Sequence, residues 1–303
     1  MYKCYNKFRK GKDVQLMDST WINAPAKINL GLDVIRKRED GYHEVKMIMQ
    51  SIRLFDRLTL TKSKTPGIHL TTNLNFLPVN EDNLVYQSAK LLMEEFGITD
   101  GLDIHLDKRI PVAAGMAGGS TDAASCMIAI NRLFGLRLSA KKLMKRGVRL
   151  GADIPYCIMK GTALSEGIGE ILTPLPNAPD CFVLIAKPVF HISTKFVYSN
   201  LKLDDHTVHP DIDTMIDCIR ENDLHRLCEN MENLLETVTI PAHPEIETIK
   251  KTMLENGALG SLMSGSGPTV FGLFDDEDKA LAAKEICRRL PYRCFVFVTD
   301  LYR

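Results

Sequence analysis

A glycine-rich run at residues 111–124, PVAAGMAGGSTDAA, is the segment with the clearest capacity for chemistry. Its small residues let backbone N–H groups close around an anion, and the helix that starts within it adds unpaired donors and a positive dipole end. Phosphate is the ligand that such a loop suits. No Lys follows the glycines as in a Walker A loop, and the spacing of Gly115, Gly118 and Gly119 is not GxGxxG. A tight turn with close helix packing is the alternative.

Polar side chains in other segments could join such a site. In APAKINL, Lys27 and Asn29 are two residues apart and therefore share one face of a strand, although a solvated strand lysine is the alternative. In LGADIP, Asp153 follows a helix and precedes a proline, a position that also suits a turn or cap residue. The SGSGP segment at 264–268 is a second anion-friendly turn or an ordinary hairpin.

The elements that must position these residues follow from periodicity. Residues 21–70 alternate polar and apolar side chains, which predicts strands. Apolar spacing predicts a helix at 83–96, and a second helix leaves the glycine-rich run and ends at Gly135. Ser139 is suited to cap a third helix that runs to about residue 149. The glycine-rich run therefore joins a strand to a helix.

A proline-rich connector, TPLPNAP, divides the chain near residues 175–180. After it the patterns follow the order of a ferredoxin-like split unit with extra helices inserted. The predicted elements are strands at 181–188, 258–265, 268–275 and 294–300 and helices at 211–220, 222–235, 243–255 and 277–290. We expect a flexible extension at 1–20, an N-terminal domain at 21–177 and a C-terminal domain at 178–303.

Composition narrows the class of protein. The 303 residues carry 38 Lys+Arg and 38 Asp+Glu, and this balance argues against general nucleic-acid binding, which needs a surplus of cations. No apolar run approaches the roughly 20 residues that span a bilayer, and the N-terminus has no apolar signal region. The 8 cysteines form no CxxC pair, so neither a zinc site nor a disulfide framework is suggested. A cytoplasmic small-molecule enzyme fits these observations.

Together the motifs resemble the GHMP kinases, the family of galactokinase, homoserine kinase and mevalonate kinase. The loop at 111–121 matches the family pattern PxxxGLGSS, with Ala117 and Thr121 where glycine and serine are usual. APAKINLGL, REDGYHE, LGADIP and EGIGE narrow the resemblance to members that phosphorylate a cytidine-diphosphate-linked sugar alcohol. The resemblance implies an α/β (α+β) protein with a ribosomal-protein-like N-terminal domain, a ferredoxin-like C-terminal domain and substrates between them.

The resemblance also implies ATP as co-substrate and a role for each motif. Asp153 would accept the proton of the acceptor hydroxyl, Lys27 would neighbour Asp153 and stabilise the transferring group, and Asn29 would orient the acceptor. The second glycine motif comprises Gly265, Ser266 and Gly267. The residues expected to hold the ATP triphosphate are Pro111, Val112, Ala113, Ala114, Gly115, Met116, Ala117, Gly118, Gly119, Ser120 and Thr121.

The cytidine end of the acceptor needs a flat slot with hydrogen-bonding groups. Tyr42 and His43 match the family segment DGYH, and a ring with two nitrogens can read a cytosine edge. The segment ISTKFVY aligns with one that supplies a second aromatic over the base. That role is assigned to Tyr198, with Thr194 nearby and Phe196 as the alternative.

Mg²⁺ is expected with ATP because the phosphate oxygens need a bridging cation. The sequence shows no dedicated metal cage, and Ser120 or Thr121 is the candidate contact. The alternatives are another kinase of the family, of homoserine or mevalonate type, and a non-catalytic nucleotide-binding protein on the same fold. The presence of both Lys27 and Asp153 argues against the last. The oligomeric state and the contacts to adenine stay open.

Overall fold

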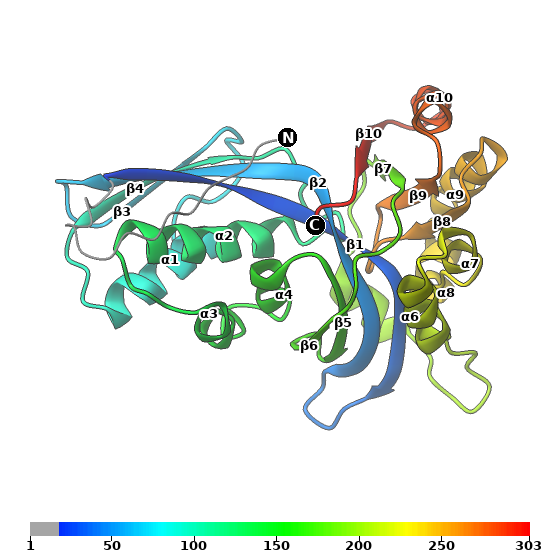
Figure 1. The fold of residues 1–303 in the computed structure, drawn as a ribbon, viewed down its shortest axis with the longest axis horizontal. Coiled ribbons are helices and arrows are strands. Elements are labelled where there is room, and N and C mark those ends of the chain that lie inside the picture. Colours follow the sequence, from blue (N-terminus) through cyan, green and yellow to red (C-terminus); the bar gives the residue numbers. More distant parts are fainter. Residues whose placement is uncertain (1–17) are drawn as a thin grey trace.

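The computed structural model describes residues 18–303, so most of the predicted N-terminal extension lies outside the described part of the chain. A long antiparallel hairpin of β1 (Ser19–Lys37) and β2 (His43–Ser63) crosses the molecule in Figure 1. The first sheet has the order β3-β4-β2-β5-β6, with β1 paired to β2. The bounds of the remaining strands are Ile68–Thr72 for β3, Gly101–Asp107 for β4, Thr162–Gly167 for β5 and Ile171–Pro174 for β6.

β1 is buried on both faces from Ala24 to Val34. Leu32 and Val34 belong to the core that includes the N-terminal helices, whereas Ile28 and Leu30 belong to a core shared with the C-terminal sheet. The sequence of a strand that lies between two cores is a nearly continuous apolar run. Any polar side chain within it must find a hydrogen-bond partner, because unpaired buried polar groups are costly.

Helices α1 to α4 lie below the part of the first sheet formed by β3, β4 and the adjoining length of β2 in Figure 1. Asn83 and Ser139 cap α1 and α3 by accepting hydrogen bonds from backbone N–H groups, so both predicted helix starts are confirmed. α4 lies outside the predicted elements, and of the turn and cap alternatives for Asp153 the structure shows an N-cap position, because proline is tolerated in a first helical turn. The bounds are Leu84–Glu95 for α1, Gly118–Leu133 for α2, Ala140–Gly147 for α3 and Ile154–Met159 for α4.

The second sheet has the order β10-β7-β9-β8 with antiparallel pairs throughout. This is the ferredoxin-like arrangement predicted from the order of elements. Its strands are β7 (Phe182–Pro188), β8 (Gly260–Met263), β9 (Val270–Phe274) and β10 (Cys294–Asp300). The helices are α5 (Thr194–Asn200), α6 (Ile212–Glu221), α7 (Leu224–Glu229), α8 (Glu236–Ala242), α9 (Glu245–Glu255) and α10 (Glu277–Cys287).

The single helix predicted at 222–235 is wrong, because the chain breaks between α7 and α8. Asn233 lies in the break and forms a parallel bridge to Leu32. Its side-chain amide donates hydrogen bonds of 2.8 Å to the carbonyl oxygens of Met263 and Gly265. The periodicity of the segment could not reveal this break, since the groups that stabilise it lie 30 and 32 residues away.

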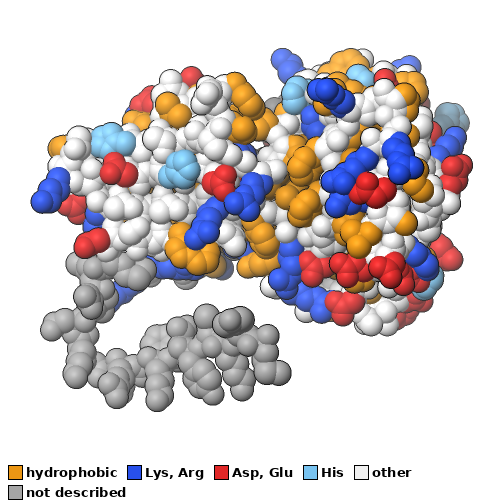
Figure 2. Space-filling view, turned by 90° about the horizontal axis from the view of Figure 1, so that it is seen from above, with side chains coloured by type: hydrophobic (Ala, Val, Ile, Leu, Met, Phe, Trp, Pro, Cys, Tyr) orange, Lys and Arg blue, Asp and Glu red, His pale blue; other side chains and the backbone are white. Residues whose placement is uncertain are grey.

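The two sheets belong to two lobes, which Figure 2 shows in space-filling form with acidic and basic side chains interspersed on the visible face. β6 ends at Pro174 and β7 begins at Phe182. The domain boundary between residues 177 and 178 falls in this connection and stays a prediction. From residue 18 to residue 303, no helix combines the length and apolar character needed to cross a membrane.

Candidate active site

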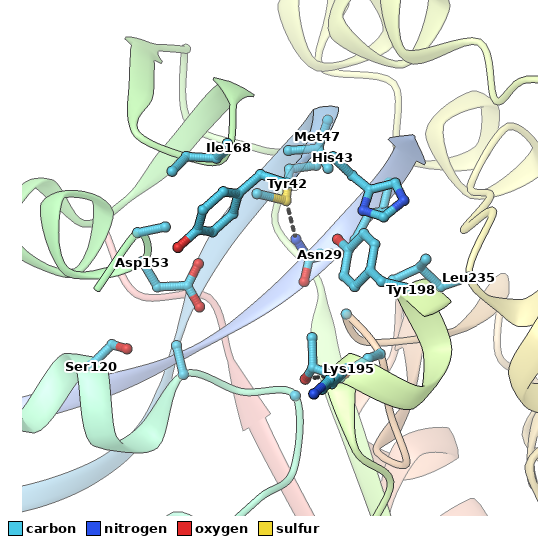
Figure 3. Close-up of a pocket in the computed structure, with 18 of the residues that line it drawn as sticks. Asn29, Tyr42, His43, Met47, Ser120, Asp153, Ile168, Lys195, Tyr198 and Leu235 are labelled. Atoms are coloured by element: carbon cyan, nitrogen blue, oxygen red, sulfur yellow. Dashed lines mark hydrogen bonds between the residues drawn. The ribbon is translucent and has the colours of Figure 1, made fainter. Parts of the chain in front are cut away.

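A cavity of about 820 Å³ brings the predicted motifs together. Its walls come from β1, the glycine-rich loop, the residues before α4, the start of α5 and the second glycine motif. Figure 3 shows Asp153 between Ser120 on one side and Tyr198 on the other. Segments separated by more than a hundred residues therefore face one space, as the resemblance implies.

The glycine-rich loop has an unusual backbone. Ala113, Gly115 and Ala117 have φ values of 51°, 71° and 53°, in the left-handed region that disfavours residues with a Cβ. Ala117 is the N-cap of α2 and offers no side-chain hydrogen bond to the helix. The N–H groups of the first turn, from Gly118 to Ser120, therefore stay available to an anion in the cavity.

Gly115 is where three distant segments meet. Its carbonyl oxygen accepts hydrogen bonds from Nζ of Lys27 at 3.1 Å and from Oγ of Ser264 at 3.0 Å. A Cβ at this position would lie 2.2 Å from the carbonyl oxygen of Ser264. The backbone N–H of Lys27 donates to the carbonyl oxygen of Met116 at 3.2 Å. The second glycine motif thus packs directly against the first.

Lys27 and Asn29 are buried, so the alternative of a solvated strand lysine is wrong. Lys27 Nζ donates to Asn29 Oδ1 at 2.7 Å, and Asn29 Nδ2 donates to the sulfur of Met47 at 3.2 Å. The expected role of Lys27 as a neighbour that acts on Asp153 stays a prediction. Both line the cavity, but the hydrogen bonds of the ammonium within residues 18–303 go to Asn29 and Gly115.

Asp153 occupies the N-cap position of α4, yet its side chain makes no capping hydrogen bond. A carboxylate that does not cap the helix can bind a ligand. In Figure 3 it points into the middle of the cavity, with the hydroxyl of Tyr42 directed toward it. This placement suits a group that accepts a proton from a bound alcohol.

His43 and Tyr198 form an aromatic pair at the far end of the cavity. Their ring centroids are 5.0 Å apart with an interplanar angle of 38°. Burial lowers the pKa of His43, and the nearby charge of Lys37 lowers it further, so the neutral imidazole is favoured. Burial raises the pKa of Tyr198 to about 12. Phe196, the alternative to Tyr198, is 45% exposed and does not line the cavity.

Several predicted residues do not reach this cavity. Met116 and Thr121 are buried elsewhere, and Gly267 lies behind the second glycine motif, where its N–H donates to the carbonyl oxygen of Ser264. Thr194 does reach it, and its hydroxyl lies 2.9 Å from that of Ser266.

Other lining residues were missed by the sequence analysis. Lys195 and Ile168 lie within the motifs ISTKFVY and EGIGE, whereas Lys37 and Met47 lie on predicted strands, and no local signal marks any of the four as a lining residue.

A smaller cavity of about 210 Å³ adjoins the outer side of the loop. Pro111 and Val112 line it rather than the main cavity, together with Leu77 and Pro78. Lys108 and Asp122 also line this cavity, and the buried Lys108 Nζ contacts the carboxylates of Asp56 and Asp122, the latter at 2.7 Å. Burial alone would lower the pKa of Lys108, but the two carboxylates outweigh this effect and raise it. A charged anchor therefore holds the strand end and the start of α2 together.

Comparison with known proteins gives the class that this fold and site define. Residues 83–161 match the family description "GHMP kinases N terminal domain", and residues 215–292 match "GHMP kinases C terminal". The chain belongs to the GHMP kinase family. Its two sheets and their helices form the two-domain fold of that family.

Individual relatives cover nearly the whole chain. The 4-diphosphocytidyl-2-C-methyl-D-erythritol kinase of Lachnoclostridium phytofermentans is 55% identical over 94% of this chain and 98% of the relative. The kinase of the same name from Lachnospira eligens is 50% identical over 94% and 99%. A crystal structure of 4-(cytidine 5′-diphospho)-2C-methyl-D-erythritol kinase has a TM-score of 0.80 and 32% identity, covering 94% of this chain and 100% of its own.

Proposed function

We propose that this chain transfers the γ-phosphoryl group of ATP to the 2-hydroxyl of 4-diphosphocytidyl-2-C-methyl-D-erythritol. The products would be the 2-phosphate and ADP, within isoprenoid precursor biosynthesis in the cytoplasm. The names of the relatives that are 50% and 55% identical support this substrate. The observation that carries the proposal is the order of groups along one cavity: the glycine-rich loop, then Asp153, then the His43 and Tyr198 rings.

ATP would lie along the glycine-rich loop. The triphosphate would face the N–H groups at the start of α2, and the adenine would enter the adjoining cavity of about 210 Å³ lined by Leu77, Pro78 and Val112. This orientation directs the γ-phosphate toward Asp153. Binding here would supply most of the catalysis, because phosphoryl transfer depends on positioning and on charge stabilisation.

Asp153 and Lys27 would have different roles at the reacting atoms, one as a proton acceptor and the other as a stabiliser of negative charge. An alcohol is far too weakly acidic to ionise at pH 7, so Asp153 would accept its proton as the hydroxyl oxygen attacks phosphorus. The Lys27 ammonium has three N–H donors, and two of them already bond to Asn29 and Gly115. The third would meet an oxygen of the transferring phosphoryl group, where developing charge is stabilised.

Mg²⁺ would enter with ATP. The ion commonly binds through one or two carboxylates plus phosphate oxygens and keeps several waters. Within the described residues, no three His, Cys, Asp or Glu side chains gather as a metal site, whereas Ser120 and Asp153 line the same cavity. These groups fit a metal carried by the nucleotide, and Ser120 rather than the buried Thr121 would be the contact. Bound there, the ion would neutralise phosphate charge.

The cytosine of the acceptor would bind against the ring of Tyr198, with His43 and Tyr42 beside it. A neutral imidazole can donate from one ring nitrogen and accept at the other, which suits the amino and carbonyl edge of cytosine. The methylerythritol would then extend toward Asn29 and Asp153.

An ADP-release assay with parallel acceptors tests the proposed function. The purified chain is supplied with Mg²⁺, ATP and either 4-diphosphocytidyl-2-C-methyl-D-erythritol, homoserine or mevalonate. We expect turnover only with the first, and ³¹P NMR of the product should show a new phosphomonoester. Absence of turnover with the first acceptor, or faster turnover with another, would overturn the proposal.

A further inference from the structure

The cavity carries a surplus of positive charge although the chain as a whole is balanced. Its lining includes Lys27, Lys37 and Lys195 but only one carboxylate, that of Asp153. The ammonium of Lys27 already contacts Asn29 and Gly115. Within the described part of the chain, neither Lys37 nor Lys195 takes part in a salt bridge. Two lysines therefore face the cavity with no internal anion to neutralise them.

The positions of these lysines separate their roles. Lys37 lies at the nucleobase end, close enough to His43 for its charge to lower the pKa of that ring. Lys195 is in the first turn of α5, three residues before Tyr198, so both side chains lie on the same face of the helix. In Figure 3, Lys195 lies below Tyr198 and to the right of Asp153, whereas Ser120, which marks the ATP side of the cavity, lies to the left.

We propose that Lys195 is a specificity-determining residue that binds the diphosphate group of the acceptor. This inference rests on the proposed function, because it needs an acceptor with its base at Tyr198 and its alcohol at Asp153. The diphosphate joins these two ends and must lie between them. Lys195 lines the same cavity one helical turn from Tyr198 and has no salt-bridge partner within residues 18–303. An ammonium binds phosphate oxygens through short charge-assisted hydrogen bonds. The charge of Lys195 does not strengthen the binding of the uncharged parts of the acceptor.

Calorimetric binding of cytidine 5′-diphosphate and of cytidine to the full chain tests the inference without requiring turnover. In Lys195→Gln, we expect the dissociation constant of cytidine 5′-diphosphate to rise about tenfold, the scale of a hydrogen bond to a charged group, while that of cytidine changes less than about twofold. Lys195→Arg should restore most of the loss because it returns the charge. In steady-state kinetics, Lys195→Gln should raise the KM of the acceptor and leave the KM of ATP nearly unchanged.

Matched variants distinguish a direct contact between Lys195 and the diphosphate from a general electrostatic effect of positive charge in the cavity. Lys37→Gln removes the same charge from the same cavity, and Lys202→Gln removes one from an exposed position outside it. Equal weakening of cytidine 5′-diphosphate binding in Lys37→Gln and Lys195→Gln would overturn the proposal, as would a rise in the KM of ATP alone. Acceptor turnover by the unaltered chain tests the proposed function separately. If the unaltered chain shows no turnover with the acceptor while Lys195→Gln selectively weakens the binding of cytidine 5′-diphosphate, the proposed acceptor is refuted. The assignment of Lys195 as a diphosphate contact would then still hold.

Discussion

The hydroxyl of Ser264 donates a hydrogen bond of 3.0 Å to the carbonyl oxygen of Gly115, although 149 residues separate the two in the chain. The bond joins the second glycine motif to the phosphate-binding candidate loop. The same carbonyl oxygen also accepts a hydrogen bond from the ammonium of Lys27 on β1. One atom of the loop is therefore bonded to a residue of each lobe. The shape of the loop therefore depends on the relative position of the two lobes.

Ser264→Ala tests this dependence. The substitution removes one of the two hydrogen bonds to the Gly115 carbonyl, and a bond of this kind contributes about 0.5–1.5 kcal/mol. We expect the KM of ATP to rise by about 2- to 10-fold in steady-state kinetics. Ser261→Ala is the matched control, since Ser261 donates to the carbonyl oxygen of Phe271 at 3.0 Å away from the loop. An equal effect of the two variants on ATP would contradict the proposed coupling.

Asp153→Asn keeps the size of the side chain but removes its capacity to accept a proton. If Asp153 is the base, kcat should fall roughly 10²–10⁴-fold, while the KM of ATP changes little. Because the side chain makes no capping hydrogen bond, the melting temperature should stay close to that of the unaltered chain. Near-normal kcat in this variant would remove Asp153 from the mechanism.

The two aromatic candidates on α5 can be separated by truncation. Tyr198→Ala removes the ring that stacks near His43, so the KM of the acceptor should rise by about 5-fold or more, in line with the 1–3 kcal/mol of a base-stacking contact. Phe196→Ala is the matched control, because Phe196 lies outside the cavity lining. A larger acceptor effect for Phe196→Ala would show that the assignment to Tyr198 is wrong.

Ala117 provides a test of loop geometry. Its φ of 53° tolerates glycine and strains a β-branched residue, so Ala117→Val should distort the loop and raise the KM of ATP about tenfold or more. Ala117→Gly should keep ATP binding near normal. Ala140→Val, at an exposed helix start, is the control for adding the same atoms elsewhere. Normal ATP kinetics in Ala117→Val would mean that the loop does not hold the triphosphate.

The titration of His43 gives a pH-dependent prediction. Burial and then the charge of Lys37 lower its pKa, so the unfolded chain binds this proton at a higher pH than the folded chain. The contribution to stability is therefore complete above the unfolded pKa of about 6.5 and declines as pH falls through that value toward the folded pKa. Lys37→Gln should raise the His43 midpoint in an NMR titration, whereas Lys202→Gln should not. An unchanged midpoint in Lys37→Gln would refute the contribution of that lysine.

Much of the fold follows from local sequence. Asn83 and Ser139 start helices where their side chains predict, and the order of elements after residue 180 predicts the ferredoxin-like sheet. These features depend on capping, periodicity and connection order, which neighbouring residues encode. The residue types of the glycine-rich run predicted an anion-binding loop, and the resemblance of the motifs to the GHMP kinases implied the ATP-dependent phosphorylation.

Tertiary structure alone decided how the motifs touch. It buried Lys27 between two cores and directed its ammonium to Asn29 and Gly115. It also broke the expected helix at Asn233, whose partners lie in a distant hairpin. Lys195 lines the cavity because α5 brings Tyr198 against His43 of the N-terminal lobe. A periodic pattern reports which face of an element is apolar, but which distant group meets that face is set by the packing of the whole chain.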